Sequence, residues 1–205
     1  MSFKENFKKF IYRFVNVFYR VEVIGADKEP DCGVLLCSNH ISNLDPVLLV
    51  TSLKTQPMFM AKKELFKIPV ISSFIKLFGA FPVERGSVDL TAMKKAISLL
   101  ENGNTVGIFP QGTRYPGKNP KDTSVKRGVG MIVSRSCTDI LPVAIITKNN
   151  KCKVFRKKFI VIGDVIKYDS LGICDKSKDE FDRISSVIFA HICDLYEKYS
   201  YLAEK

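Results

Sequence analysis

The sequence predicts a single α/β domain, in which helices flank a mostly parallel or mixed β-sheet. The chain has 205 residues, 46% of them hydrophobic and 26% charged, which is typical of one globular domain and excludes collagen, coiled coils and disorder. Beyond Gly25, short apolar runs alternate with segments of helical periodicity, the pattern of α/β architecture. No internal repeat or long linker divides the chain.

The first 20 residues predict an amphipathic helix. Five phenylalanines recur at spacings of 4, 3, 4 and 4: Phe3, Phe7, Phe10, Phe14 and Phe18. Five Lys or Arg lie on their flanks. This stripe could pack on the protein's own domain, or it could lie in a membrane interface beside anionic lipids. The two interpretations coexist if the stripe is only partly covered. We therefore expect an interface helix over residues 1–20 and a domain over residues 21–205.

The strands and remaining helices follow from apolar runs and from their flanking residues. Strands are predicted over residues 34–37, 58–60, 80–83, 105–109, 140–146 and 159–162. Helices are predicted over residues 46–53, 69–78, 90–100 and 181–199. Ser87 can cap the helix over residues 90–100, and Asn102-Gly103 can end it. Ser177 and Glu180 form a capping box ahead of the helix over residues 181–199.

Charge points to acidic partners. The chain has 32 Lys and Arg against 21 Asp and Glu, a net charge of +11, which suits nucleic acid, an anionic membrane surface or phosphate-bearing substrates. Nucleic acid is disfavoured because the aromatic residues form no evident stacking platform. Residues 151–158 carry five cations in eight positions, which could meet an acidic partner protein, lipid headgroups or only solvent.

No segment predicts a membrane span. The longest stretch without a charged residue covers 13 positions, residues 32–44, whereas a spanning helix needs about 20 mostly apolar residues. Residues 1–20 do not resemble a signal peptide. We therefore expect a peripheral or monotopic protein at the cytoplasmic face of the cell membrane. The six cysteines form no C-x-x-C pair, so no metal site is predicted.

His40 is the main candidate for chemistry. It follows a predicted strand, and α/β proteins place ligands and catalysts in loops at the carboxyl ends of strands. Five residues on, Asp45 could cap the next helix, accept the imidazole N–H, or do both. Such a pair is half a nucleophilic triad or a complete general-base dyad. Because no Gly-x-Ser-x-Gly elbow surrounds Cys37 or Ser38, direct activation of a bound alcohol by His40 fits better.

Two further strand-end turns predict an anion site. In the turn at residues 109–114, Gly112 permits positive φ, Thr113 supplies a hydroxyl and Arg114 supplies a planar fork suited to phosphate. A second turn carries Arg85. Together with the His40 loop, these turns predict one anion-lined cleft.

Four blocks of this sequence, in order and spacing, resemble those of the glycerolipid acyltransferase family. They are Asn39-His40 with Asp45, and residues 79–86, 109–114 and 141–145. Residues 59–66, which include Lys62, also resemble that family. The match runs from about residue 33 to residue 146 and is most similar to the bacterial 1-acyl-sn-glycerol-3-phosphate acyltransferases.

The resemblance implies a role in phospholipid biosynthesis. An acyl group would pass from acyl-CoA or acyl-acyl carrier protein, with no other cofactor, to the sn-2 hydroxyl of lysophosphatidate, giving phosphatidate. It implies that His40 is the general base and that Asp45 orients it. The residues implied to bind substrate are Lys62, Arg85, Gly112, Thr113 and Arg114.

Gln111 departs from the family pattern, which usually has Glu at this position. We expect Gln111 to shape the turn and to bind substrate, without acid/base work. The departure leaves other acceptors open, namely another lysophospholipid or glycerol 3-phosphate. A non-catalytic peripheral lipid-binding protein is the alternative from a different class, although a pure binder has no need of a tuned imidazole.

Overall fold

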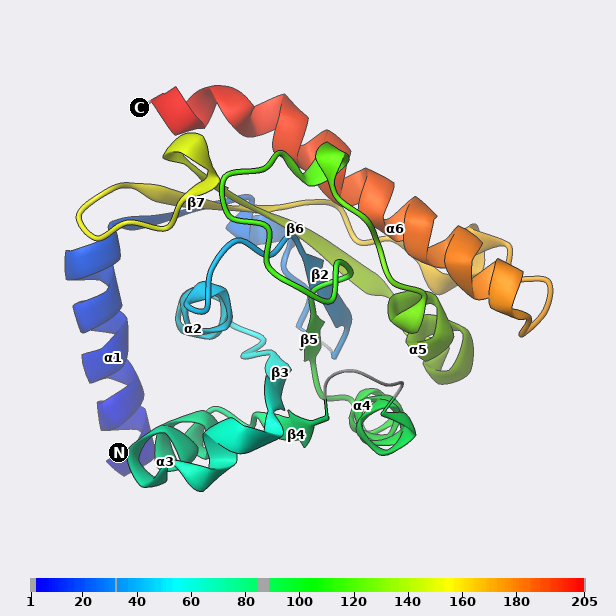
Figure 1. Ribbon diagram of the computed structural model, residues 1–205, viewed down its shortest axis with the longest axis horizontal. Coiled ribbons are helices and arrows are strands. Elements are labelled where there is room, and N and C mark those ends of the chain that lie inside the picture. The colour runs from blue at the N-terminus through cyan, green and yellow to red at the C-terminus, as the bar shows by residue number, and fades with distance from the viewer. Residues whose placement is uncertain (1–2, 32, 85–88, 205) are drawn as a thin grey trace.

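The structure is a computed structural model that describes residues 3–31, 33–84 and 89–204, and it contains one seven-stranded sheet (Figure 1). The strand order is β1-β7-β6-β2-β5-β3-β4. The strands are β1 (Val21–Ile24), β2 (Leu35–Ser38), β3 (Met58–Lys62), β4 (Phe81–Val83), β5 (Val106–Ile108), β6 (Ile140–Thr147) and β7 (Lys158–Ile162). Strands β2 to β6 are parallel, whereas β7 runs antiparallel to β6 and parallel to β1. The predicted mixed α/β sheet is confirmed.

The helices are α1 (Phe3–Tyr19), α2 (Asp45–Ser52), α3 (Pro69–Leu77), α4 (Leu90–Glu101), α5 (Gly128–Ser136) and α6 (Lys178–Tyr199). The sequence predicted all of them except α5, and all strands except β1. Helix α5 contains Gly128 and Gly130, which are poor helix formers, so it depends on its packing between α4 and α6. Strand β1 has only four residues, directly after a helix, and pairs with β7, which is distant in sequence.

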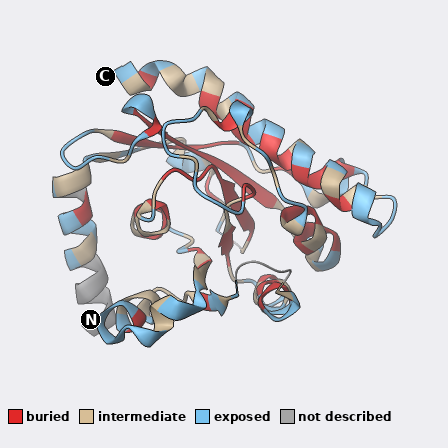
Figure 2. Ribbon diagram, in the orientation of Figure 1, coloured by how far each residue is buried: buried red, intermediate tan, exposed pale blue. Residues whose placement is uncertain are grey.

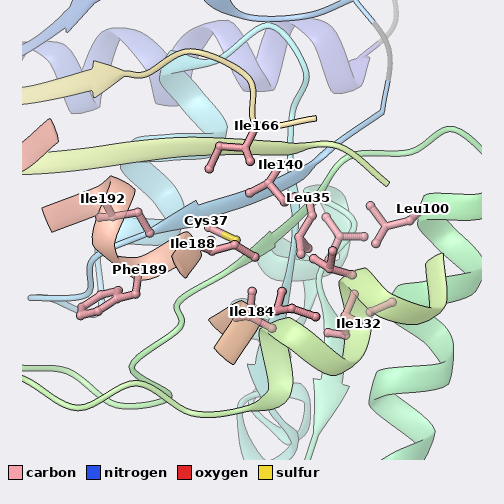
Figure 3. Close-up of a cluster of buried hydrophobic side chains, with 14 of the residues drawn as sticks. Leu35, Cys37, Leu100, Ile132, Ile140, Ile166, Ile184, Ile188, Phe189 and Ile192 are labelled. Carbon is pink, nitrogen blue, oxygen red and sulfur yellow. The ribbon is translucent and has the colours of Figure 1, made fainter. Parts of the chain in front are cut away.

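Central strand β2 is buried on both sides (Figure 2), as expected for a parallel strand covered by helices. Its residues alternate between two apolar clusters. Leu35 and Cys37 point toward α4, α5 and α6, where they contact a cluster that includes Ile132 and Ile188 (Figure 3). Leu36 lies in the opposite cluster, which includes α1 and α2.

Two predicted helix caps differ in detail. Asp89 caps α4, because its Oδ1 accepts the N–H of Ala92 at 2.9 Å, whereas Ser87 lies outside the described residues. Ser177 Oγ accepts the N–H of Glu180 at 3.1 Å, which confirms half of the capping box. The Glu180 carboxylate pairs with Arg183 instead of returning to Ser177, and this pairing lowers the pKa of Glu180 to about 2.

Because β7 runs antiparallel to β6, several loops lie together at one edge of the sheet. The loops that follow β2, β3, β4 and β5 leave the sheet where these parallel strands end. Because β7 and β1 run the opposite way, they begin at the same edge. The connection from β6 to β7 and the junction between α1 and β1 therefore lie there too. We call this side of the sheet the carboxyl edge.

Helix α1 is only partly covered. Ile11, Val15 and Tyr19 face the cluster around α2 and form its packed stripe. Phe10 and Val17 are 62% and 66% exposed, so part of the phenylalanine side of the helix faces away from the domain. Among the described residues, no helix is both long and apolar enough to cross a membrane.

Close packing of α5 on α6 is expected to depend on Gly130. A Cβ at this position would lie 2.1 Å from the backbone oxygen of Phe181, so Gly130→Ala is predicted to lower the free energy of unfolding by about 1–3 kcal/mol. The control is Gly128→Ala on the same helix, whose Cβ would meet only Met93 Cε at 4.0 Å. It is expected to be neutral or slightly stabilising. Urea unfolding of both variants tests this, and equal stabilities would contradict it.

Candidate active site

The His40 loop begins where β2 separates from β6. Asn39 takes the place of a backbone partner there: its Nδ2 donates to the Ile145 carbonyl at 2.9 Å, and its Oδ1 accepts the Ile145 N–H at 2.7 Å. Asn39 is fully buried. This paired amide lets the backbone leave the ladder without an unsatisfied group and fixes where His40 begins its loop.

One oxygen of Asp45 organises the whole loop. His40 Nδ1 lies 2.7 Å from Asp45 Oδ2, and the same oxygen accepts the N–H groups of Ile41 and Ser42, each at 2.7 Å. Asp45 is the first residue of α2, but Leu44 occupies the N-cap position and has no side-chain cap bond. Of the two roles that the sequence allowed for Asp45, the helix cap is therefore wrong. Its carboxylate binds the loop before it and the imidazole.

The imidazole is held in plane as well as in position. Its ring stacks on Phe109 with centroids 3.9 Å apart and an interplanar angle of 11°, and Phe109 in turn stacks on Phe59 at 5.2 Å. The side chain of His40 is buried. Because Nδ1 is engaged by Asp45, Nε2 is the nitrogen left to act on a substrate.

Gln111 joins the loop after β5 to the loop after β2. This side chain is only 1% exposed. Its Oε1 accepts the His40 backbone N–H at 2.7 Å, and its Nε2 donates to Thr123 Oγ1 at 2.7 Å. Tyr115 N donates to the His40 carbonyl at 2.8 Å, so one loop holds both backbone groups of His40. Both ends of the Gln111 amide are thus used within the protein, and its contact with substrate stays a prediction.

The expected phosphate-binding turn lies beside this histidine. Gly112 has φ of +67° and donates its N–H to the Phe109 carbonyl at 2.9 Å, which closes the turn in a conformation that favours glycine. Thr113 and Arg114 are exposed. Their side chains are therefore accessible to an anionic ligand.

Of the two remaining cations implied to bind substrate, Lys62 and Arg85, the structure describes only Lys62. Lys62 is the last residue of β3 and is half-exposed, and its Nζ lies 3.6 Å from Glu64 Oε1. Arg85 falls outside the described residues. Since β2, β5, β3 and β4 are consecutive neighbours, their carboxyl ends form a row that starts at the His40 loop. This order brings the loop of Lys62 next to the turn of Arg114.

A cavity of about 500 Å³ lies at the other edge of the sheet. Its lining includes Gly33, Met58 and Thr105, which precede or begin β2, β3 and β5. His40, Asp45 and Arg114 do not line it. This cavity therefore does not contain the candidate groups, which lie at the carboxyl edge.

Two supports of the site carry no sequence signal that singled them out. Phe109 is the ring on which His40 stacks, although its position in the sequence indicated only the end of a strand. Thr123 binds Gln111 from 12 residues away, and its Oγ1 donates to the Pro120 carbonyl at 2.6 Å. Only the folded loop brings these groups together.

An α/β sheet with a buried His-Asp pair at its carboxyl edge defines a class of general-base enzymes. Comparison with known proteins narrows this class. The family model described as "Acyltransferase" matches residues 20–146, so the chain belongs to the acyltransferase family.

Several proteins are similar to this chain in sequence or in structure. The chain is 35% identical over 139 residues to the 1-acyl-sn-glycerol-3-phosphate acyltransferase of Bacillus subtilis, covering 67% of this chain and 68% of that protein. It is 32% identical to the protein of the same name from Borreliella burgdorferi, where the match covers 64% of this chain and about half, 53%, of the relative. The crystal structure of PlsC from Thermotoga maritima, a 1-acyl-sn-glycerophosphate acyltransferase, is similar with a TM-score of 0.73 and 27% identity. That match covers 96% of this chain and 80% of the other.

The buried amide of Gln111 is expected to stabilise the site loops. Gln111→Leu removes the acceptor of the His40 N–H and should lower the free energy of unfolding by about 1–3 kcal/mol. Gln111→Glu, which introduces the usual family residue, keeps an acceptor for that N–H, and the Thr123 hydroxyl can turn to donate to it. We expect this variant to be the more stable of the two in urea unfolding. A Gln111→Leu protein as stable as the wild type would refute the role.

Proposed function

We propose that this chain transfers an acyl group from an acyl thioester, acyl-CoA or acyl-acyl carrier protein, to the sn-2 hydroxyl of 1-acyl-sn-glycerol 3-phosphate, giving phosphatidate. The observation that carries this proposal is the buried His40-Asp45 pair at 2.7 Å. The names of the relatives support the acceptor and the reaction type. The strand ends of β3 and β5, next to the His40 loop, offer Lys62 and the turn of Arg114.

His40 and Asp45 supply the acid/base chemistry. His40 Nε2 takes the proton of the sn-2 hydroxyl as the hydroxyl oxygen attacks the thioester carbonyl carbon and forms the new C–O bond. The tetrahedral intermediate then breaks its C–S bond, and the departing sulfur takes the proton from Nε2. His40 is thereby returned to its starting form. Asp45 Oδ2 accepts the Nδ1–H throughout, which holds the tautomer and stabilises the transient imidazolium.

Cations around the carboxyl edge suit the acceptor phosphate. Arg114 presents a planar fork for bidentate binding, and Thr113 and Gly112 lie in the same exposed turn. Lys62 and, on sequence grounds, Arg85 extend this charge along the neighbouring strand ends. Gln111 acts as a positioning residue through the His40 backbone.

His40→Ala is expected to lower turnover about 10²- to 10⁴-fold while leaving the fold intact, since it removes the general base. The assay uses lysophosphatidate with each thioester donor and identifies products by mass. His191→Ala is the matched control, because His191 is the other histidine of the chain and is exposed on α6. Near-normal turnover of the His40 variant would overturn the mechanism, and a product other than phosphatidate would overturn the acceptor.

Asp45 variants separate orientation of the imidazole from support of the loop. Asp45→Asn keeps an oxygen for the two backbone N–H groups but loses the charge and places an NH₂ group where the buried Oδ1 lies. We expect a folded protein with greatly reduced turnover. Asp45→Ala should also lower the unfolding midpoint, because it leaves two N–H groups without an acceptor. A fully active Asp45→Asn would rule out the orienting role.

We also propose that α1 docks on an anionic membrane surface. The exposed Phe10, Phe14 and Val17 follow helical spacing and so share one face. Arg13 lies among these residues in the sequence, Lys8 and Lys9 precede Phe10, and Arg20 follows the helix. Apolar side chains can enter the acyl boundary while the cations remain with the headgroups. Because the junction of α1 and β1 lies at the carboxyl edge, docking through α1 brings that edge close to the membrane.

Removal of the exposed apolar side chains is predicted to release the protein from vesicles. The double variant Phe10→Ser/Val17→Ser should bind phosphatidylglycerol-containing vesicles about 10-fold or more weakly, with unchanged turnover of a soluble short-chain acceptor. Leu90→Ser on α4 provides the control, because Leu90 is also more than half exposed but lies on another helix. Vesicle sedimentation measures both. Unchanged binding of the double variant would show that α1 is not the anchor.

A further inference from the structure

A second basic site lies beside the end of α1. A hollow of about 330 Å³ opens between Arg20, the connection from β6 to β7, and the 3₁₀ helix at Ser200–Glu204. We call it the basic hollow. We propose that it binds the phosphate of an anionic phospholipid headgroup of the membrane. This inference rests on the proposed docking of α1 and assigns the lipid class that the docked protein recognises.

Charge in the basic hollow favours an anion. Four cationic side chains line it: Arg20, Lys148, Arg156 and Lys157. Glu204 is the single carboxylate in the lining and is exposed. Arginine can grip a phosphate through two parallel N–H groups, and lysine adds a point charge. Cations therefore outnumber acids in a concave site large enough for a polar headgroup.

A buried lysine holds this site in shape. Lys158 is fully buried, and its Nζ donates to the carbonyl oxygens of Lys153 and Arg156 while lying 4.8 Å from the Tyr19 ring centroid. Burial lowers the pKa of Lys158. The backbone of the loop is thus wrapped around one ammonium group. Arg156 and Lys157 are carried on a fixed backbone, which reduces the ordering cost of binding an anion.

Backbone conformation around the basic hollow is unusual. Arg20 and Phe155 both adopt left-handed φ values, 46° and 61°, although neither is glycine. A bulky aromatic residue in this region is an outlier, and such outliers persist where the surroundings impose them, often at ligand-binding sites. Phe155 N donates to the Phe18 carbonyl at 2.6 Å, so the loop is tied to the end of α1.

Aromatic side chains connect the basic hollow to the exposed face of α1. Phe155, which is 64% exposed, lies 5.6 Å from the Phe18 ring, and Phe18 lies 4.4 Å from Phe14. A phospholipid with its phosphate among the cations would therefore have its acyl chains beside exposed apolar groups. This arrangement favours an amphiphile over inorganic phosphate. It also favours a lipid over an acidic carrier protein, which offers no acyl chains to that exposed face.

The basic hollow shares the carboxyl edge with the candidate active site. Gly117 N donates to the Asn150 carbonyl at 2.8 Å, in the segment that follows Lys148. The same loop donates to the His40 carbonyl through Tyr115 N. A lipid bound in the basic hollow would hold the membrane surface next to the loops that surround His40.

The test compares Arg156→Gln/Lys157→Gln with Lys94→Gln/Lys95→Gln. Both remove two charges, but Lys94 and Lys95 are exposed on α4, away from the hollow. Phosphatidylcholine vesicles carry either phosphatidylglycerol or, at equal surface charge, oleate. We expect Arg156→Gln/Lys157→Gln to bind phosphatidylglycerol vesicles about 10-fold or more weakly than the wild type and to lose the preference for phosphatidylglycerol over oleate. The affinity of Lys94→Gln/Lys95→Gln for the same vesicles should change about 2-fold or less. Equal losses in both variants, or no preference in the wild type, would overturn the proposal.

A second measurement uses the unaltered protein, so it does not depend on how the variants fold. Dihexanoyl phosphatidylglycerol, below its micelle concentration, should perturb the NMR resonances of Arg20, Lys148, Arg156 and Lys157. Perturbation of the same size by inorganic phosphate at equal concentration would overturn the lipid assignment. Loss of transfer from acyl-acyl carrier protein alone, with normal vesicle binding by the variant, would assign the surface to a carrier protein instead.

Catalysis is followed separately with acyl-CoA and a soluble short-chain acceptor. Because His40, Asp45 and Arg114 lie outside the basic hollow, Arg156→Gln/Lys157→Gln should keep wild-type turnover in this assay. Absence of turnover in the wild type would refute the proposed acyltransferase function and leave the lipid-binding result intact. A loss of turnover confined to the variant would count against a separate headgroup site.

Discussion

The active-site loop depends on one carboxylate oxygen. Asp45 Oδ2 accepts the backbone N–H groups of Ile41 and Ser42 as well as facing His40 Nδ1, so the same atom shapes the loop and orients the imidazole. Because these contacts lie in a buried site, an unpaired donor there would be costly, and the loop has little freedom to rearrange. The stack of His40 on Phe109 and the bond from Gln111 then fix the remaining directions in which the imidazole could move. Position and tautomer thus depend on Asp45 at the start of α2, and the ring plane depends on the loop after β5.

Topology concentrates every proposed activity at one edge of the sheet. The parallel strands deliver the His40 loop, the Arg114 turn and Lys62 there, as expected for α/β proteins. The antiparallel β7 adds what a fully parallel sheet would lack, because its start, the start of β1 and the end of α1 all return to that edge. The end of α1 and the basic hollow therefore lie at the same edge as the His40 loop. Under the proposed docking, an acceptor that is itself a lipid reaches His40 from the membrane surface.

The basic segment at residues 151–158 contains both a buried cation, Lys158, and cations that line the basic hollow. As a run of charges, residues 151–158 could be a solvated hairpin, a partner surface or a lipid-binding loop. In the structure one cation turns inward and binds the carbonyls of Lys153 and Arg156, while Arg156 and Lys157 line the basic hollow. Charge count alone could not separate these roles, because the direction of a side chain depends on the backbone fold. The inward lysine is what gives the outward cations a defined arrangement.

The sequence by itself determined the fold class, most elements and the identity of the main candidates. Periodicity located α6 and β6 because their apolar patterns are long, and the His40 and Arg114 motifs are local in sequence.

Tertiary structure alone decided what depends on contacts between distant segments. Helix α5 contains two glycines and is stabilised by packing, and β1 forms because β7 pairs with it. Asp45 looked like a helix cap, yet its oxygen turns to the preceding loop. Gln111 was expected to shape the turn, but only the fold shows that its amide joins His40 to Thr123. Local patterns predict which residues are present at an edge, but the partner that each polar atom finds is set only when the whole chain is folded.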